Sequence, residues 1–149
     1  MDNDRLRAMY QEMILEHNKS PRNFGPLEGH THYGHGKNPF CGDDYEFYLE
    51  VKNDVIERVG FTGDGCAISK SSASMLTTMV KGKSIEDARK LSETFLEFIL
   101  NEGPKESLGK LKIFEGVKQF PVRVKCATLS WRALEQALLK TKHIASTEA

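Results

Sequence analysis

The residues of this sequence that could do chemistry are three cysteines and one acid. The cysteines are Cys41, Cys66 and Cys126, and the acid is Asp43, two residues after Cys41 in the stretch NPFCGDD. Three thiolates and one carboxylate make a set of four ligands that suits a tetrahedral Zn²⁺ site. Each cysteine stands at the boundary of an expected helix or strand, and such boundaries face the ends of a sheet, so the three can converge there. The glycine between Cys41 and Asp43 lets the backbone bend between two ligands.

The carboxylate makes the expected site asymmetric. An oxygen ligand is harder than a fourth thiolate and a weaker partner for zinc, so the shell is easier to remodel when another protein offers a ligand. Cys41, released as a thiolate, would then be a nucleophile toward sulfur. Cys66 opens a helix, where the helix dipole favours the thiolate. Arg123 and Lys125 precede Cys126 and would offset the negative charge of the loaded site.

Other interpretations of these residues stay open at the level of the sequence. Free cysteines are often buried as small hydrophobic residues, and no CxxC pair marks a zinc ribbon. Histidine is a rival ligand for zinc. His30, His32 and His35 lie in the glycine-rich stretch GHTHYGHG, where we expect them at the surface, and we expect His17 and His143 at helix ends. The serines of SKSSAS fit small residues on a closely packed helix better than a Ser-Lys nucleophile.

Composition excludes several classes of protein. The chain has 149 residues, which predicts one domain, and its 21 basic residues balance its 21 acidic residues. A nucleic-acid-binding protein normally has a basic excess. No apolar run approaches the roughly 20 residues that span a bilayer, and the N-terminus has no apolar signal-peptide region. We therefore expect a cytoplasmic protein with neither a nucleic-acid nor a membrane partner. In that reducing compartment, an odd number of cysteines indicates catalysis, metal binding or burial rather than disulfides.

The expected strands and helices are segregated along the chain. Apolar residues recur at three- and four-residue steps over residues 3–17, which predicts a helix. Alternation predicts two strands at 44–52 and 55–62, paired as an antiparallel hairpin, and a third strand is weakly patterned at 30–37. Further helices are expected at 66–82 and at 84–100, the latter with Ser84 as N-cap. A short helix or turn is expected at 111–121 and a last helix at 122–142, with Trp131 in the core or at an interface.

These elements favour an α+β fold, a small antiparallel sheet of about three strands with helices packed on one face. The whole chain, residues 1–149, is expected to form this one domain. Its tail, residues 143–149, is expected to be frayed.

Four segments of the chain resemble the SufU branch of the IscU/NifU-type iron–sulfur cluster assembly proteins. They read MYQEMILEHNKSPRN, NPFCGDD, FTGDGCAISKSSASMLT and FPVRVKCATLSWRALEQAL, and together they cover most of the chain, from about residue 7 to 139. The order Cys-Gly-Asp, Gly-Cys-x-Ile-Ser, Lys-Cys-x-x-Leu is specific to the family. Two features resemble the SufU branch. Lys125 stands where IscU-type scaffolds carry histidine, and the stretch between Cys66 and Cys126 is long.

The resemblance implies a SufE/IscU-like fold and zinc held by Cys41, Asp43, Cys66 and Cys126. It implies a sulfurtransferase that accepts persulfide sulfur on Cys41 from a SufS-type cysteine desulfurase, activates that desulfurase and serves downstream Suf assembly proteins. A partner histidine would displace Cys41 from zinc before the transfer. The main alternative is a scaffold on which an iron–sulfur cluster is built and handed on, and a purely structural zinc domain is a third possibility.

Overall fold

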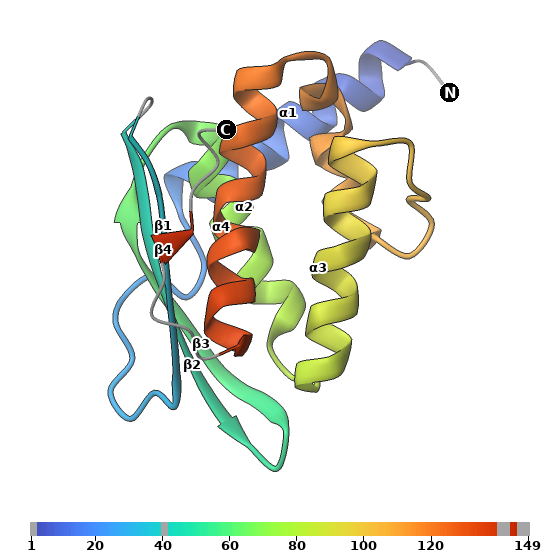
Figure 1. Cartoon of the computed structure of the whole chain (residues 1–149). Helices are drawn as coiled ribbons and strands as arrows, with labels where there is room; N and C mark the ends of the chain where they lie inside the picture. The colour runs from blue at the N-terminus through green and yellow to red at the C-terminus, as the bar shows by residue number, and fades with distance from the viewer. Residues whose placement is uncertain (1–2, 40–41, 140–143, 146–149) are drawn as a thin grey trace.

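The computed structural model describes residues 3–39, 42–139 and 144–145 of the chain. Three strands, β1 (His32–Asn38), β2 (Asp43–Lys52) and β3 (Val55–Asp64), form an antiparallel sheet with β2 in the centre. A two-residue strand, β4 (Ile144–Ala145), pairs in parallel with β1. All the helices lie on one side of this sheet (Figure 1). The fold is therefore α+β, as the sequence predicts.

The helices form two layers on the sheet. Against the strands lie α2 (Ala67–Val80), which contacts β3, and α4 (Pro121–Leu139), which contacts β1 and β2. Farther out, α1 (Asn3–Lys19) packs on α2 and α3 (Ile85–Leu100) packs on α4. A 3₁₀ segment, η1 (Gly109–Gln119), joins α3 to α4 and contacts α1. No helix in the described part of the chain combines the length and apolar character needed to cross a bilayer.

Local sequence explains these elements. In β2, Tyr45, Phe47 and Leu49 alternate with half-exposed polar residues and are fully buried under the helices. This is the period of two that a sheet with one covered face requires. The Ser84 side chain caps α3 by accepting from the Asp87 N–H at 3.0 Å, as predicted. Trp131 is in the core, one of the two places expected for it, and it stacks on Phe95.

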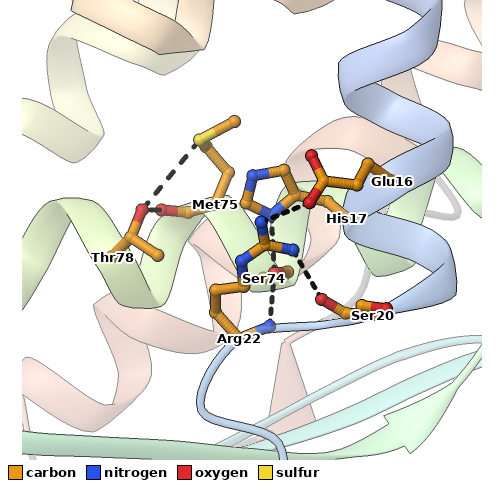
Figure 2. A network of polar contacts seen from close by, with 7 residues as sticks. All are labelled: Glu16, His17, Ser20, Arg22, Ser74, Met75 and Thr78. Carbon is orange, nitrogen blue, oxygen red and sulfur yellow. Dashed lines mark hydrogen bonds and ion pairs between the residues drawn. The ribbon is translucent and has the colours of Figure 1, made fainter.

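The serines of α2 form polar contacts between helices. The Ser72 hydroxyl donates to the Ala127 carbonyl oxygen at 2.6 Å and accepts from the Trp131 indole N–H at 3.1 Å. Ser74 binds the segment at the end of α1, where it accepts from the Arg22 backbone N–H at 2.8 Å and lies 2.7 Å from His17 Nδ1 (Figure 2). The prediction of a closely packed helix is correct, and these serines also satisfy buried polar groups at the contacts.

Figure 2 shows His17 and Arg22 converging on Ser74 from two sides. Ser74 Oγ accepts from the Arg22 N–H and also forms a hydrogen bond with His17 Nδ1, so it joins the end of α1 to the segment that follows. Burial, and then the charge of Arg22, lower the pKa of His17 below its usual value. His17 lies in the last turn of α1, as expected, but it is a buried anchor rather than an exposed helix-end residue.

Two expectations for the ends of the sheet need correction. The glycine-rich stretch is strand β1, and its Gly34 faces α4 so closely that a Cβ there would lie 2.9 Å from the backbone nitrogen of Ala137. His32, expected at the surface, is buried in this strand. In the tail expected to be frayed, residues 144–145 pair with His35 and Gly36 of β1. The other tail residues, His143 among them, lie outside the described part of the chain.

Candidate metal centre

Three of the four predicted ligands meet at one end of the sheet. Asp43 begins β2, Cys66 immediately precedes α2, and Cys126 lies in the second turn of α4. One carboxylate oxygen of Asp43 and the two sulfurs all lie within 4.8 Å of one another. In Figure 1 the starts of these elements gather at the top of the molecule. The fourth predicted ligand, Cys41, lies outside the described residues.

Asp43 is fully buried, and its two oxygens have different surroundings. Oδ1 accepts from the Cys66 backbone N–H at 3.0 Å, which joins the start of β2 to the start of α2. Oδ2 has no hydrogen-bond partner among the residues that the structure describes. A buried carboxylate oxygen without a partner is costly. A cation beside the two cysteines would satisfy it, so the donor set and its surroundings fit a metal ion.

Cys66 is held by the helix that it opens. It is the N-cap residue of α2, and the Ser69 backbone N–H donates to its sulfur at 3.4 Å. The hydrogen bond with Cys126, followed by those from Ser69, lowers the pKa of Cys66 to about 6. The same contact with Cys66, together with burial, raises the pKa of Cys126. The contact between the two sulfurs therefore favours a thiolate at Cys66 over one at Cys126.

The centre depends on residues that the sequence analysis did not single out. Tyr45, on the buried face of β2, points its hydroxyl to Ser69 Oγ at 2.8 Å. A Cβ on Gly65 would lie 2.6 Å from Ser69 Oγ and 2.7 Å from the Tyr45 hydroxyl, and would also overlap Asp43 Oδ1. A signal for Ser69 was present, because it is three residues after a helix-capping cysteine. Nothing in the sequence marked Tyr45 or Gly65.

Gly42 lies between the two predicted ligands Cys41 and Asp43 in the chain. Its φ of +77° lies in the left-handed region that favours glycine. The Gly42 N–H donates to the Asn38 carbonyl oxygen at 3.0 Å, which closes the turn between β1 and β2. The expectation of a glycine-dependent bend before Asp43 is therefore correct.

The histidines and basic residues have other partners. His35 binds Asp44 at 2.5 Å, His32 lies 2.8 Å from the Thr31 hydroxyl, and His30 is exposed. In the described ranges, the cluster of Asp43 and the two cysteines is the one group of such residues with metal-site spacing, and no histidine joins it.

Arg123 lies in the first turn of α4, one turn before Cys126, and its guanidinium stacks over the Phe120 ring at 4.5 Å. Lys125 is half-buried beside Cys126.

A cavity of about 330 Å³ opens next to the centre. Its lining includes Ile68, two residues after Cys66, and the two arginines Arg7 and Arg123. Neither arginine takes part in an ion pair with any described residue. By contrast, glutamates pair with Arg22, Arg58, Arg89 and Arg132. The cavity thus combines apolar side chains such as Ile68 with two arginines that have no acidic partner among the described residues.

Comparisons with known proteins agree with this geometry. Residues 9–147 match the family described as the NifU-like N terminal domain. The chain is 40% identical over 140 residues to the zinc-dependent sulfurtransferase SufU of Bacillus subtilis. That alignment covers 93% of this chain and 95% of the relative. It is 37% identical over 139 residues to the iron–sulfur cluster assembly scaffold protein IscU of Streptococcus pyogenes. That alignment covers 92% of this chain and 87% of the relative.

Solved structures share the fold. FiSufU of Fervidobacterium islandicum, a protein assigned to the SUF system, superposes with a TM-score of 0.83 at 34% identity, over 89% of this chain and 98% of that one. A NifU-like N-terminal domain from Brucella abortus superposes with a TM-score of 0.80, over 91% of this chain and 95% of that one. Its identity is 20%, so it supports the fold alone.

Proposed function

Because the chain belongs to the family of NifU-like N-terminal domains, we propose that it is a zinc-dependent sulfur acceptor of iron–sulfur cluster assembly. Its sulfur comes from the persulfide of a SufS-type cysteine desulfurase, which it also activates, and it passes the sulfur to downstream Suf assembly proteins. The relative named as a zinc-dependent sulfurtransferase supports this proposal over nearly the whole length of both chains.

The observation that carries the proposal is the buried Asp43 Oδ2, which has no described partner and belongs to the cluster with Cys66 and Cys126. Two sulfurs and one oxygen from the protein, completed by Cys41, are a set of donors that Zn²⁺ accepts. The metal, when bound, would keep the thiolates deprotonated at neutral pH and the site folded. Asp43 Oδ1 stays on the Cys66 N–H, which leaves Oδ2 to act as the ligand.

Cys41 is the proposed acceptor. Its thiolate attacks the outer sulfur of the desulfurase persulfide, so a new S–S bond forms on Cys41 while the S–S bond of the donor breaks. The donor cysteine leaves as a thiolate, and the transfer involves no net oxidation or reduction. The left-handed Gly42 next to Cys41 supports this role, because it turns the chain sharply between the acceptor and the buried Asp43.

A scaffold that builds and releases an iron–sulfur cluster is the second candidate, and relatives named IscU favour it. Cysteine thiolates also hold such clusters. Lys125, directly before Cys126, argues for the sulfur acceptor, because a protonated ammonium group cannot ligate a metal whereas a histidine can.

The test combines metal analysis with a desulfurase assay. The purified chain should contain about one zinc per molecule, and adding it should raise the turnover of a SufS-type desulfurase. Mass spectrometry after one turnover should find one extra sulfur atom on Cys41. The Cys41→Ala variant should lose the stimulation, whereas Ser71→Ala, a buried change away from the centre, should keep it.

Unchanged stimulation by Cys41→Ala would contradict the proposed role. A brown, iron-containing chain that transfers a cluster to an apo-acceptor, without stimulating the desulfurase, would favour the scaffold instead.

A further inference from the structure

The hydroxyl groups of Tyr45 and Ser69 lie behind Cys66, on the buried side of the candidate metal centre. Both side chains are almost fully buried, with exposed fractions of 0% and 1%. The two oxygens are 2.8 Å apart, and Ser69 Oγ is 3.6 Å from Cys66 Sγ. Three polar groups from β2, α2 and the helix cap thus form one continuous chain that ends at the sulfur.

The direction of these hydrogen bonds follows from counting protons. Ser69 Oγ is the one partner found for the Tyr45 hydroxyl among the described residues, so the Tyr45 proton must bind it or remain unsatisfied. Ser69 has a single hydroxyl proton, which donates to the Cys66 carbonyl oxygen at 3.0 Å. That carbonyl also accepts from the Lys70 N–H at 3.0 Å. It therefore stays satisfied if the Ser69 proton turns elsewhere.

A thiolate at Cys66 gives the Ser69 proton a better acceptor. As a metal ligand, this sulfur has no proton to donate and can only accept. The contact between Ser69 Oγ and Sγ must then run from the hydroxyl to the sulfur, beside the Ser69 backbone N–H that already donates to it at 3.4 Å. Hydrogen bonds to a charged acceptor are about twice as strong as neutral ones. The Tyr45 hydroxyl fixes this arrangement, because it occupies the acceptor side of Ser69.

We propose that Tyr45 and Ser69 are positioning residues that hold the Cys66 sulfur in place, so that Cys66 is the permanent ligand of the site while another ligand exchanges. The inference rests on the proposed metal site and goes beyond it, because it assigns different roles to the cysteines. The Ser69 backbone N–H donates to Cys66 Sγ, and the Ser69 hydroxyl lies 3.6 Å from the same sulfur, where it could donate to a metal-bound thiolate. The side chains that contact the Cys126 thiol are Cys66 and Asp43, and both belong to the proposed ligand set.

The test measures zinc affinity by competition with a chromophoric chelator. Tyr45→Phe removes one hydroxyl and keeps the ring, and Ser69→Ala removes the other. Loss of a group that orients a metal ligand typically weakens metal binding by about 10- to 100-fold, and we expect this range for each variant. Two matched controls should bind zinc like the wild type: Tyr48→Phe, whose hydroxyl lies on the opposite face of β2, and Ser71→Ala, whose hydroxyl binds within α2.

A double variant guards against a trivial loss of folding. Ser69→Ala alone leaves the buried Tyr45 hydroxyl without a partner, which destabilises the chain by itself. Tyr45→Phe combined with Ser69→Ala removes both polar groups together, so its zinc affinity reports on the sulfur. The Co²⁺-loaded proteins give a second readout. A thiolate that has lost a hydrogen bond donates charge more readily, so its sulfur-to-cobalt absorption should move to lower energy in the variants and not in the controls.

Zinc affinities and cobalt spectra of all three variants equal to those of the controls would overturn the inference and leave the proposed function intact. A wild-type chain that binds no zinc would overturn the proposed function first, and this inference with it. Weaker zinc binding with the spectral shift, confined to the variants that lose the Tyr45 or Ser69 hydroxyl, is the result that we expect.

Discussion

Replacing Gly65 with alanine should disrupt the candidate metal centre directly, because the added methyl group would meet three of its side chains. The ideal Cβ would stand 2.6 Å from Ser69 Oγ and 2.7 Å from the Tyr45 hydroxyl oxygen, and nearer still to Asp43 Oδ1. Contacts of a real Cβ essentially never fall below 3.0 Å. All three of these atoms belong to buried side chains, so none can swing into solvent.

The size of the effect follows from these distances. Ordinary van der Waals contact begins at 3.4 Å, so Ser69 Oγ would have to retreat by about 0.8 Å. Such a shift would stretch the 2.8 Å hydrogen bond to Tyr45 and move the carboxylate of Asp43 off the Cys66 N–H. Adding a methyl group to a well-packed core costs about 1–3 kcal/mol. We expect Gly65→Ala to lose that much free energy of unfolding and to bind zinc more weakly.

Urea unfolding and zinc analysis test this prediction. Gly116→Ala is the matched control, because no heavy atom lies within 4 Å of its ideal Cβ and its φ is not in the left-handed region. The control should stay within about 0.5 kcal/mol of the wild type. If Gly65→Ala unfolds at the same urea concentration as Gly116→Ala and retains its zinc, the packing argument for the centre is wrong.

Three further predictions concern other parts of the molecule. Because the folded chain resists protonation of His17, the free energy of unfolding should fall as pH drops below the ordinary histidine pKa of about 6.5. Unfolding curves from pH 8 to 5 should show a smaller fall for His17→Gln, and an equal fall would contradict the assignment. Arg7→Glu with Arg123→Glu should raise the concentration of this chain that half-saturates the desulfurase by about 10-fold, as two contacts of roughly 0.7 kcal/mol require. Arg89→Glu is the control, and an equal effect there would indicate general charge rather than the cavity. Asp43→Cys should keep zinc but lose sulfur acceptance, measured as persulfide on the chain, and undiminished acceptance would refute a role for the weak oxygen ligand.

The parts of the fold that follow from local chemistry could be predicted from the sequence. Strand β2 follows from its alternation, and α3 begins after Ser84 because that side chain caps its own helix. The meeting of Asp43, Cys66 and Cys126 could also be anticipated, because each stands at the start of an element and those starts share one end of the sheet.

What could not be predicted depends on pairs of residues far apart in the chain. Ser74 and His17 are 57 positions apart, and Tyr45 and Ser69 are 24 apart, so neither hydrogen bond has a local pattern. Gly34 shows the same limit. In the sequence it belongs to a glycine-rich stretch expected at the surface, whereas in the structure it is the place where α4 packs closely against β1. A glycine at the surface and a glycine packed against a helix cannot be told apart in the sequence, because the neighbouring helix is not known.

The different surroundings of the two Asp43 oxygens suggest why an acid stands at this position rather than a fourth cysteine. A cysteine offers one sulfur, so it would have to use the same atom to ligate a metal and to accept the Cys66 N–H that Oδ1 accepts. The carboxylate does both, because its oxygens point in different directions. One oxygen ties β2 to the start of α2, and the other is left for a weaker bond to the metal. The protein can therefore keep its ligand-bearing elements joined through Oδ1 even while the bonds around the metal change.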